Sequence, residues 1–97
     1  MDAAVKVNYV DVVKQTLLKE ERRLAVGDLV SRVVFDDERS TYLLLTVGTD
    51  DNEDVFEVSI AVSITANGKV KIERDMTDFG FVDSLLESGV AYDNIIQ

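Results

Sequence analysis

The sequence contains no cysteine, histidine, proline or tryptophan, and these absences remove whole classes of function. Without cysteine the chain has no disulfide and no thiolate ligand for a metal. Without histidine it lacks the commonest general base and the commonest metal ligand. It also has no glycine-rich phosphate loop, and no histidine is available to activate a serine or threonine. Nothing in the sequence therefore looks like an enzyme active site, and we expect no cofactor.

Positive charge is scarce as well, because 10 lysines and arginines stand against 19 aspartates and glutamates, for a formal net charge of −9. Strong binding to nucleic acid needs lysine and arginine to neutralise phosphates, so we do not expect strong direct binding to DNA or RNA. An acidic surface instead favours solubility or contact with a basic partner. No run approaches the ~20 apolar residues of a membrane span, and no signal peptide is recognisable, so we expect a cytoplasmic protein.

The length of 97 residues predicts a single domain over residues 1–97, with enough valine, isoleucine and leucine for a core. The first segment, Ala3–Leu24, is predicted to be one amphipathic helix. Glu20 falls close to its apolar stripe and is a blemish in the pattern. Gly27 is expected to follow the end of the helix. The stripe consists of apolar residues at helical spacing: Val5, Tyr9, Val13, Leu17 and Leu24.

Strands are predicted next. Leu29–Phe35 is rich in β-branched residues, and Tyr42–Val47 is apolar on both faces, which indicates a central strand. Val55–Thr65 alternates with period two, so one face of it is expected to carry all the large apolar side chains. Asn67-Gly68 predicts a type I′ turn into a fourth strand that contains Val70 and Ile72. The residues expected on the apolar face of the third strand are Phe56, Val58, Ile60, Val62 and Ile64.

The chain then returns to helix. Thr77 or Asp78 is expected to cap a short helix that runs to about Ser88, before Gly89. Tyr92–Ile96 is predicted to form a last turn. The fold class is therefore α+β: an N-terminal helix, a four-stranded antiparallel meander, and a C-terminal short helix or helices packed on one face of the sheet.

Two acidic runs raise the alternative of a small metal-dependent enzyme that uses loop carboxylates. They are Asp36–Glu38 and Asp50–Asp54, and hard cations bind where several oxygens converge. Neither run has the spacing of a calcium-binding EF-hand loop, and both fall where hairpin loops are expected. A further grouping on one predicted hairpin resembles the carboxylates and lysine of metal-dependent nucleases, although any half-exposed hairpin shows the same alternation. Its members are Asp54, Glu57, Lys69 and Lys71.

Three stretches, Phe35–Gly48, Asn67–Asp78 and Gly80–Ile95, together resemble the XisI family, named for a factor that controls excision of the fdxN element in cyanobacteria. They resemble the family's Tyr-Leu-Leu strand with Val-Gly, its Gly-Lys hairpin, and its short helix with an Asp-Ile ending. This chain differs in having Thr49 where members usually have tryptophan, and it ends before the family's tail. We therefore expect a divergent or C-terminally shortened member.

The resemblance implies a non-enzymatic accessory protein that controls site-specific DNA excision. Its implied partner is an XisH-like protein, which itself resembles nucleases, or a recombinase. Two more hypotheses are an antitoxin- or immunity-like inhibitor of a nuclease, and a homodimer paired through the strand Leu29–Phe35. Polar residues within the resembling stretches are the candidate partner contacts, although loop capping and internal ion pairs explain each of them equally well. They are Asp36, Asp37, Glu38, Arg39, Arg74 and Asp75.

Overall fold

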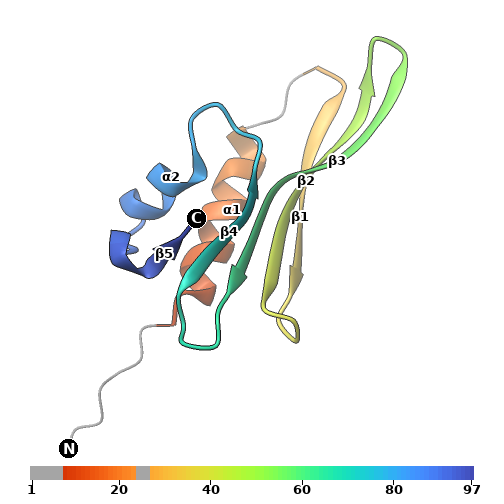
Figure 1. Ribbon diagram of the computed structural model, residues 1–97. Coiled ribbons are helices and arrows are strands. Elements are labelled where there is room, and N and C mark those ends of the chain that lie inside the picture. Colours follow the sequence, from red (N-terminus) through yellow and green to blue (C-terminus); the bar gives the residue numbers. More distant parts are fainter. Residues whose placement is uncertain (1–7, 24–26) are drawn as a thin grey trace, which may run out of the picture.

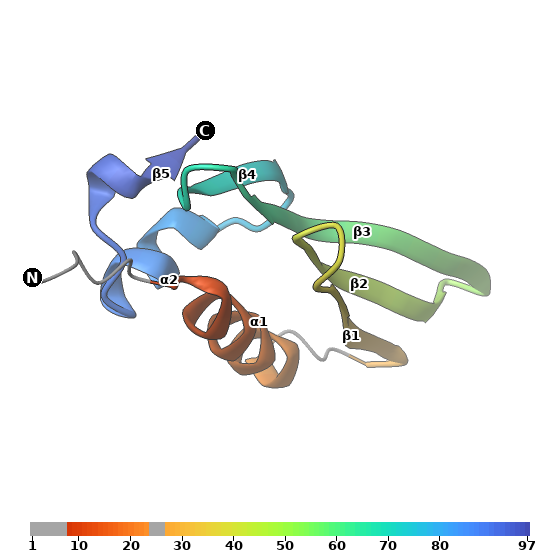
Figure 2. The ribbon, with the colours of Figure 1, turned by 90° about the horizontal axis from the view of Figure 1, so that it is seen from below.

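The computed structural model describes residues 8–23 and 27–97, and these form two layers (Figures 1 and 2). The helices lie on one face of a twisted sheet whose strand order is β1-β2-β3-β4-β5. The first four strands are antiparallel neighbours, and β5 runs parallel to β4. The predicted α+β class and antiparallel meander are therefore confirmed. The elements are α1 (Val10–Arg23), β1 (Leu29–Asp36), β2 (Thr41–Asp50), β3 (Glu53–Ile64), β4 (Val70–Asp75), α2 (Phe81–Glu87), η1 (Tyr92–Asn94) and β5 (Ile95–Ile96).

Helix α1 begins where a side chain can cap it. The Asn8 side-chain oxygen accepts the backbone N–H of Val10 at 2.9 Å, which satisfies one of the N–H groups that have no partner within the first turn of a helix. The predicted helical residues 3–7 and Leu24 lie outside the described residues. Within α1 the predicted stripe is confirmed, because Val13 and Leu17 are fully buried and Tyr9 is nearly so. The stripe packs on the sheet face that carries Leu44, Ile60 and Val62, together with α2.

Strand β3 does not keep one alternation along its length, so that part of the sequence prediction is wrong. Leu44 of β2 pairs with Ile60, but the next residue, Leu45, pairs with Val58. Ser59 is therefore an extra residue, a β-bulge, which reverses the facing of everything before it. Ile60, Val62 and Ile64 face the helices, whereas Phe56 and Val58 face away from them. The bulge has a non-local partner, because the carbonyl of Ser59 accepts the backbone N–H of Met76 at 2.8 Å.

The predicted type I′ turn at Asn67-Gly68 is also wrong, because only Gly68 of the pair has a positive φ, of 83°. The loop is one residue longer than a two-residue turn, since the backbone N–H of Gly68 donates to the carbonyl of Thr65 at 2.9 Å. Positive φ at two successive residues occurs instead in the loop between β2 and β3, at Asp51 (49°) and Asn52 (65°). A two-residue turn with positive φ at both residues therefore closes the β2–β3 hairpin and matches the twist of its strands.

The C-terminal part differs from its prediction in two details. Helix α2 begins at Phe81, with Gly80 at its N-cap and no side-chain cap from Thr77 or Asp78. The last segment forms the expected turn at Tyr92–Asn94, and Ile95–Ile96 then adds a short strand beside β4. This strand was not predicted, because two isoleucines carry no periodicity of their own.

Candidate functional site

The first group of candidate residues lies in the β1–β2 turn, where most of the polar atoms bond within the turn. The Asp36 carboxylate accepts the backbone N–H of Arg39 at 3.1 Å and its guanidinium at 3.0 Å. The side-chain hydrogen bond from Arg39 is the main reason that the pKa of Asp36 is lowered. Glu38 is exposed beside them. Asp36 and Arg39 therefore shape the turn.

Asp37 joins the turn to the helix layer. Its carboxylate accepts a hydrogen bond from the Lys14 ammonium of α1 at 3.0 Å and another from the Tyr42 hydroxyl at 2.9 Å. The pKa of Asp37 is lowered by the Lys14 hydrogen bond and then by that of Tyr42. Burial of the Tyr42 hydroxyl, followed by its bond to Asp37, raises the pKa of Tyr42 to about 12. The Phe35 ring meets the Tyr42 ring edge-on, with centroids 5.9 Å apart.

The second group of candidates, Arg74 and Asp75, lies at the end of β4. The Arg74 guanidinium donates from Nε to the carbonyl of Val58 at 2.9 Å. The Asp75 carboxylate accepts the backbone N–H of Thr77 at 2.9 Å and that of Phe81 at 2.6 Å. Asp75 therefore holds the entry to α2, which is a structural role.

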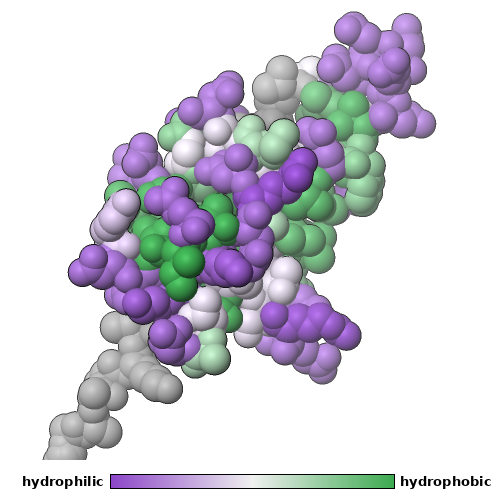
Figure 3. Space-filling model, in the orientation of Figure 1, coloured by the Kyte–Doolittle hydropathy of each residue, from purple (hydrophilic) through white to green (hydrophobic). Residues whose placement is uncertain are grey.

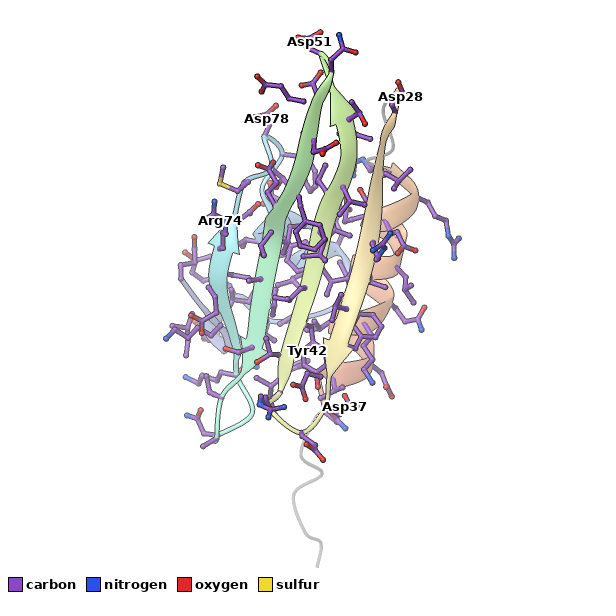
Figure 4. The ribbon with its side chains drawn as sticks, turned by 90° about the vertical axis from the view of Figure 1, so that its right-hand side faces the viewer. Asp28, Asp37, Tyr42, Asp51, Arg74 and Asp78 are labelled. Atoms are coloured by element: carbon purple, nitrogen blue, oxygen red, sulfur yellow. The ribbon has the colours of Figure 1, made fainter. Side chains whose placement is uncertain are left out.

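The structure does not bring the two candidate groups together. Asp37 lies at the lower end of the sheet and Arg74 on its left side, in the upper half (Figure 4). Asp36, Asp37, Arg39, Arg74 and Asp75 all have partners within the fold. Glu38 is the one candidate for which no side-chain bond is seen within residues 8–23 and 27–97. The six residues do not form a single binding site.

The acidic run of the β2–β3 hairpin stands at the far tip of the molecule, with Asp51 at its end (Figure 4). In the described part of the chain, no three carboxylates come together in a way that would hold a metal ion. The described carboxylates thus give no support to the metal-dependent alternative. Within the same residues, no ion pair engages the four acids of the tip, which are Asp50, Asp51, Glu53 and Asp54.

An open hollow of about 460 Å³ runs along α1 beside Ser88. The Thr16 and Ser88 hydroxyls lie 3.1 Å apart there. Each hydroxyl has one proton, and a nearby carbonyl competes for it: that of Val12 lies 2.6 Å from the Thr16 oxygen and that of Ser84 lies 2.8 Å from the Ser88 oxygen. Both hydroxyls are therefore engaged within the fold, where the end of α2 meets α1.

The sheet has a second face, which no described helix covers. Residues that pair directly across antiparallel strands point to the same side, so the register places Val30, Val47 and Phe56 together on this side. Leu45 and Val47 are buried, yet they lie outside the core cluster under the helices. We call this side the open sheet face, and it faces the viewer in Figure 4. Its apolar residues are Val30, Val34, Leu43, Leu45, Val47, Phe56 and Val58.

Sequence reasoning missed this face because strict alternation had placed Phe56 and Val58 in the core. One signal was present in β2, where Tyr42 and Leu44 alternate with Leu43 and Leu45. A strand that is apolar on both sides needs cover on both sides. Among the described residues the helices lie on one side of the sheet, and the second apolar side has no helix over it.

Comparison with known proteins identifies the fold and the family. The family model described as XisI protein matches residues 1–97. The chain belongs to the XisI family. A solved XisI-like protein from Anabaena variabilis ATCC 29413 is similar, with a TM-score of 0.79 and 23% identity over 92% of this chain and 82% of the other. The fdxN element excision controlling factor XisI from the same organism has a TM-score of 0.68 and 27% identity over 92% and 86%.

No curated protein sequence matches the chain. Family membership thus rests on the XisI match over the whole chain, and the two Anabaena structures share its α+β fold. Within the described residues, no helix is long and apolar enough to cross a membrane. The open sheet face and the acidic tip of this XisI-family chain both belong to its sheet, which is part of the fold that it shares with the two Anabaena structures.

Proposed function

We propose that this protein is a non-enzymatic accessory factor that controls excision of a DNA element by binding a nuclease-like, XisH-type protein or a recombinase. The observation that carries the proposal is the XisI family match over residues 1–97. The similar structure of an fdxN element excision controlling factor, at 27% identity, supports it. In this proposal the partner supplies the cutting chemistry.

The charge of the chain supports a protein partner rather than DNA. With a net charge of −9, the surface repels phosphates over long distances. A protein that handles DNA carries a basic groove, and an acidic domain is complementary to such a groove. The acidic hairpin tip is the most concentrated part of this charge. Electrostatic complementarity of this kind speeds association and selects the partner.

The direct test is co-expression with the XisH-type protein of the same genome, followed by a sizing column at low salt. We expect the two proteins to elute together and to separate at high salt, because salt screens exposed charges. Clean separation at low salt would overturn the proposal for this chain.

A second test measures the biological output. Deleting the gene in its host should change the frequency of excised junctions, counted by quantitative PCR across the junction. The wild-type gene supplied in trans should restore the original frequency. An unchanged frequency after deletion would contradict a role in controlling excision.

A further inference from the structure

The bulge at Ser59 places a large aromatic side chain in solvent. Because Leu45 pairs with Val58 and Val47 pairs with Phe56, both residues of β3 lie on the open sheet face. The Phe56 side chain is 74% exposed, which is a high value for phenylalanine, and it lies in the part of β3 that pairs with β2 but not with β4. β-Bulges commonly re-aim side chains next to functional sites. The bulge therefore turns Phe56 and Val58 from the helix side to the open side.

Phe56 does not stand alone. Val30 and Phe56 both pair with Val47, from the two sides of β2, and Val30 is 49% exposed. Val34, which is 41% exposed, lies further along β1. Together they border the buried Leu45 and Val47 and make an apolar strip across β1, β2 and β3, which Arg32 interrupts on β1 between Val30 and Val34. A contiguous apolar surface on a soluble domain marks an interaction site more often than scattered apolar residues do.

The acidic residues next to the apolar strip indicate the charge of the partner that covers it. Asp54 pairs with Thr49, so its carboxylate lies on the open sheet face two residues from Phe56. Beyond it stands the rest of the acidic tip, and Figure 3 shows these hydrophilic residues gathered directly above hydrophobic ones on that side of the molecule. Like charges this close repel one another, and cations of a partner relieve that repulsion. Arg32 and Arg74 lie on the same face farther from the tip than Phe56. The charge of the face therefore changes from negative at the tip to positive away from it.

The β1 edge of the sheet is a poorer docking place than the open sheet face. β1 is an edge strand, but the backbone N–H of Val33 points outward and donates to the Glu21 carboxylate of α1 at 2.9 Å. A strand added beside β1 would have to displace Glu21, so the helix blocks continuous pairing there. This contact also disfavours a homodimer built through the predicted edge strand Leu29–Phe35.

A second copy of the chain is a poor occupant of the open sheet face. Each copy carries the same acidic tip and a net charge of −9, so two copies repel each other although each has Arg32 and Arg74 on this face. This favours a partner with its own basic residues.

We propose that the open sheet face, with Phe56 as its anchor, is the docking surface for a protein that presents an apolar pocket flanked by lysine or arginine on the side of the β2–β3 tip. This inference rests on the proposed function and names the surface that the function uses. A buried aromatic anchor of this kind, surrounded by a charged rim, is the usual form of an interface hot spot.

The test measures binding of immobilised XisH-type protein to the full-length chain by surface plasmon resonance. Phe56→Ala should weaken the affinity by about 30-fold, as loss of a hot-spot residue does. Tyr92→Ala is the matched control, because Tyr92 is also exposed but belongs to η1 on the helix side. It should bind as the wild type does. Equal thermal melting of Phe56→Ala and wild type shows that the fold is intact.

The charge of the tip is tested separately. The double variant Asp51→Asn with Asp54→Asn should slow association by about tenfold at low salt and flatten its salt dependence. The double variant Asp83→Asn with Glu87→Gln, which removes two exposed carboxylates of α2, is the matched control and should leave the association rate nearly unchanged.

The outcomes separate the two proposals. If the wild type binds and Phe56→Ala binds equally well, the docking surface is wrong while the proposed function stands. If the wild type does not bind, both fall together. If light scattering shows that the chain alone is a dimer that Phe56→Asp converts to monomer, a second copy is the occupant and the inference is overturned.

Discussion

The Asp75 carboxylate accepts the backbone N–H of Phe81 at 2.6 Å and so caps α2 from the end of β4. The cap reaches across six residues, because Gly80 at the N-cap position has no side chain to offer. The same carboxylate bonds the backbone N–H and the hydroxyl of Thr77. One side chain thereby sets both the connection after β4 and the start of the helix.

Asp75→Ala should lower the free energy of unfolding by about 2 kcal/mol, since it removes a helix cap and leaves the Phe81 N–H without its partner. Urea denaturation followed by circular dichroism measures the change. Asp78→Ala is the matched control, because Asp78 is exposed and makes no cap, and it should change stability by less than about 0.5 kcal/mol. Equal effects of the two substitutions would show that Asp75 is not the cap.

The Tyr42–Asp37 bond predicts a loss of stability in alkali. The folded pKa of Tyr42 is raised to about 12, so the unfolded chain loses this proton first as pH rises above the ordinary value of 10.0. Stability from this group is therefore complete below about pH 10 and falls by about 2 kcal/mol by pH 12. Denaturant unfolding at a series of pH values measures the decline, which should be shallower in Tyr42→Phe. The same slope in both proteins would contradict the assignment.

The Lys14–Asp37 pair predicts a change at the acid end. The pKa of Asp37 is lowered mainly by its hydrogen bond from Lys14, so Lys14→Gln should move it back toward 3.8. NMR titration of the side-chain carboxyl carbon reports it. Because the folded pKa is lowered, this contribution to stability is present above about pH 3.8 and is lost as pH falls. Lys19→Gln on the exposed side of α1 is the control, and an unchanged pKa in Lys14→Gln would refute the pairing.

Gly48 fixes the close approach of β1 to β2 below the acidic tip. Its φ is +137°, and a Cβ atom there would stand 2.2 Å from the backbone carbonyl oxygen of Asp28. Gly48→Ala should therefore destabilise the protein by at least about 2 kcal/mol. Gly68→Ala, at φ +83° with open space around it, should cost only about 1 kcal/mol. Thermal melting of both variants decides, and equal losses would contradict the steric account.

The order of elements was predictable because each carries its own local pattern. The helical spacing of Val13 and Leu17 and the apolar runs of β1 and β2 needed no knowledge of neighbours. Glu20 shows the limit of this reasoning. It falls near the stripe and the structure buries it, with its Oε1 accepting a hydrogen bond from Ser84 of α2 at 3.1 Å. Glu20, the polar residue close to the apolar stripe, therefore contacts the second helix.

The features that were missed are set by residues distant in the sequence. The bulged Ser59 is hydrogen-bonded to the backbone of Met76, and α2 is capped by Asp75 across six residues. The choice of candidate site residues failed for a related reason. Asp36, Arg39 and Asp75 were selected as polar residues near strand ends, and strand ends are where turns and caps consume polar side chains. The open sheet face was hidden because register, not composition, decides which side Phe56 takes.

The central claim is that this chain acts by binding a basic, DNA-handling protein. Calorimetric titration of the wild-type chain into purified XisH-type protein, at about 50 mM and then about 500 mM salt, tests it most directly, because the Debye length falls several-fold over that range. The account predicts one-to-one binding at low salt that weakens by at least about tenfold at high salt. Absence of binding at low salt, or an affinity that does not change with salt, would contradict it.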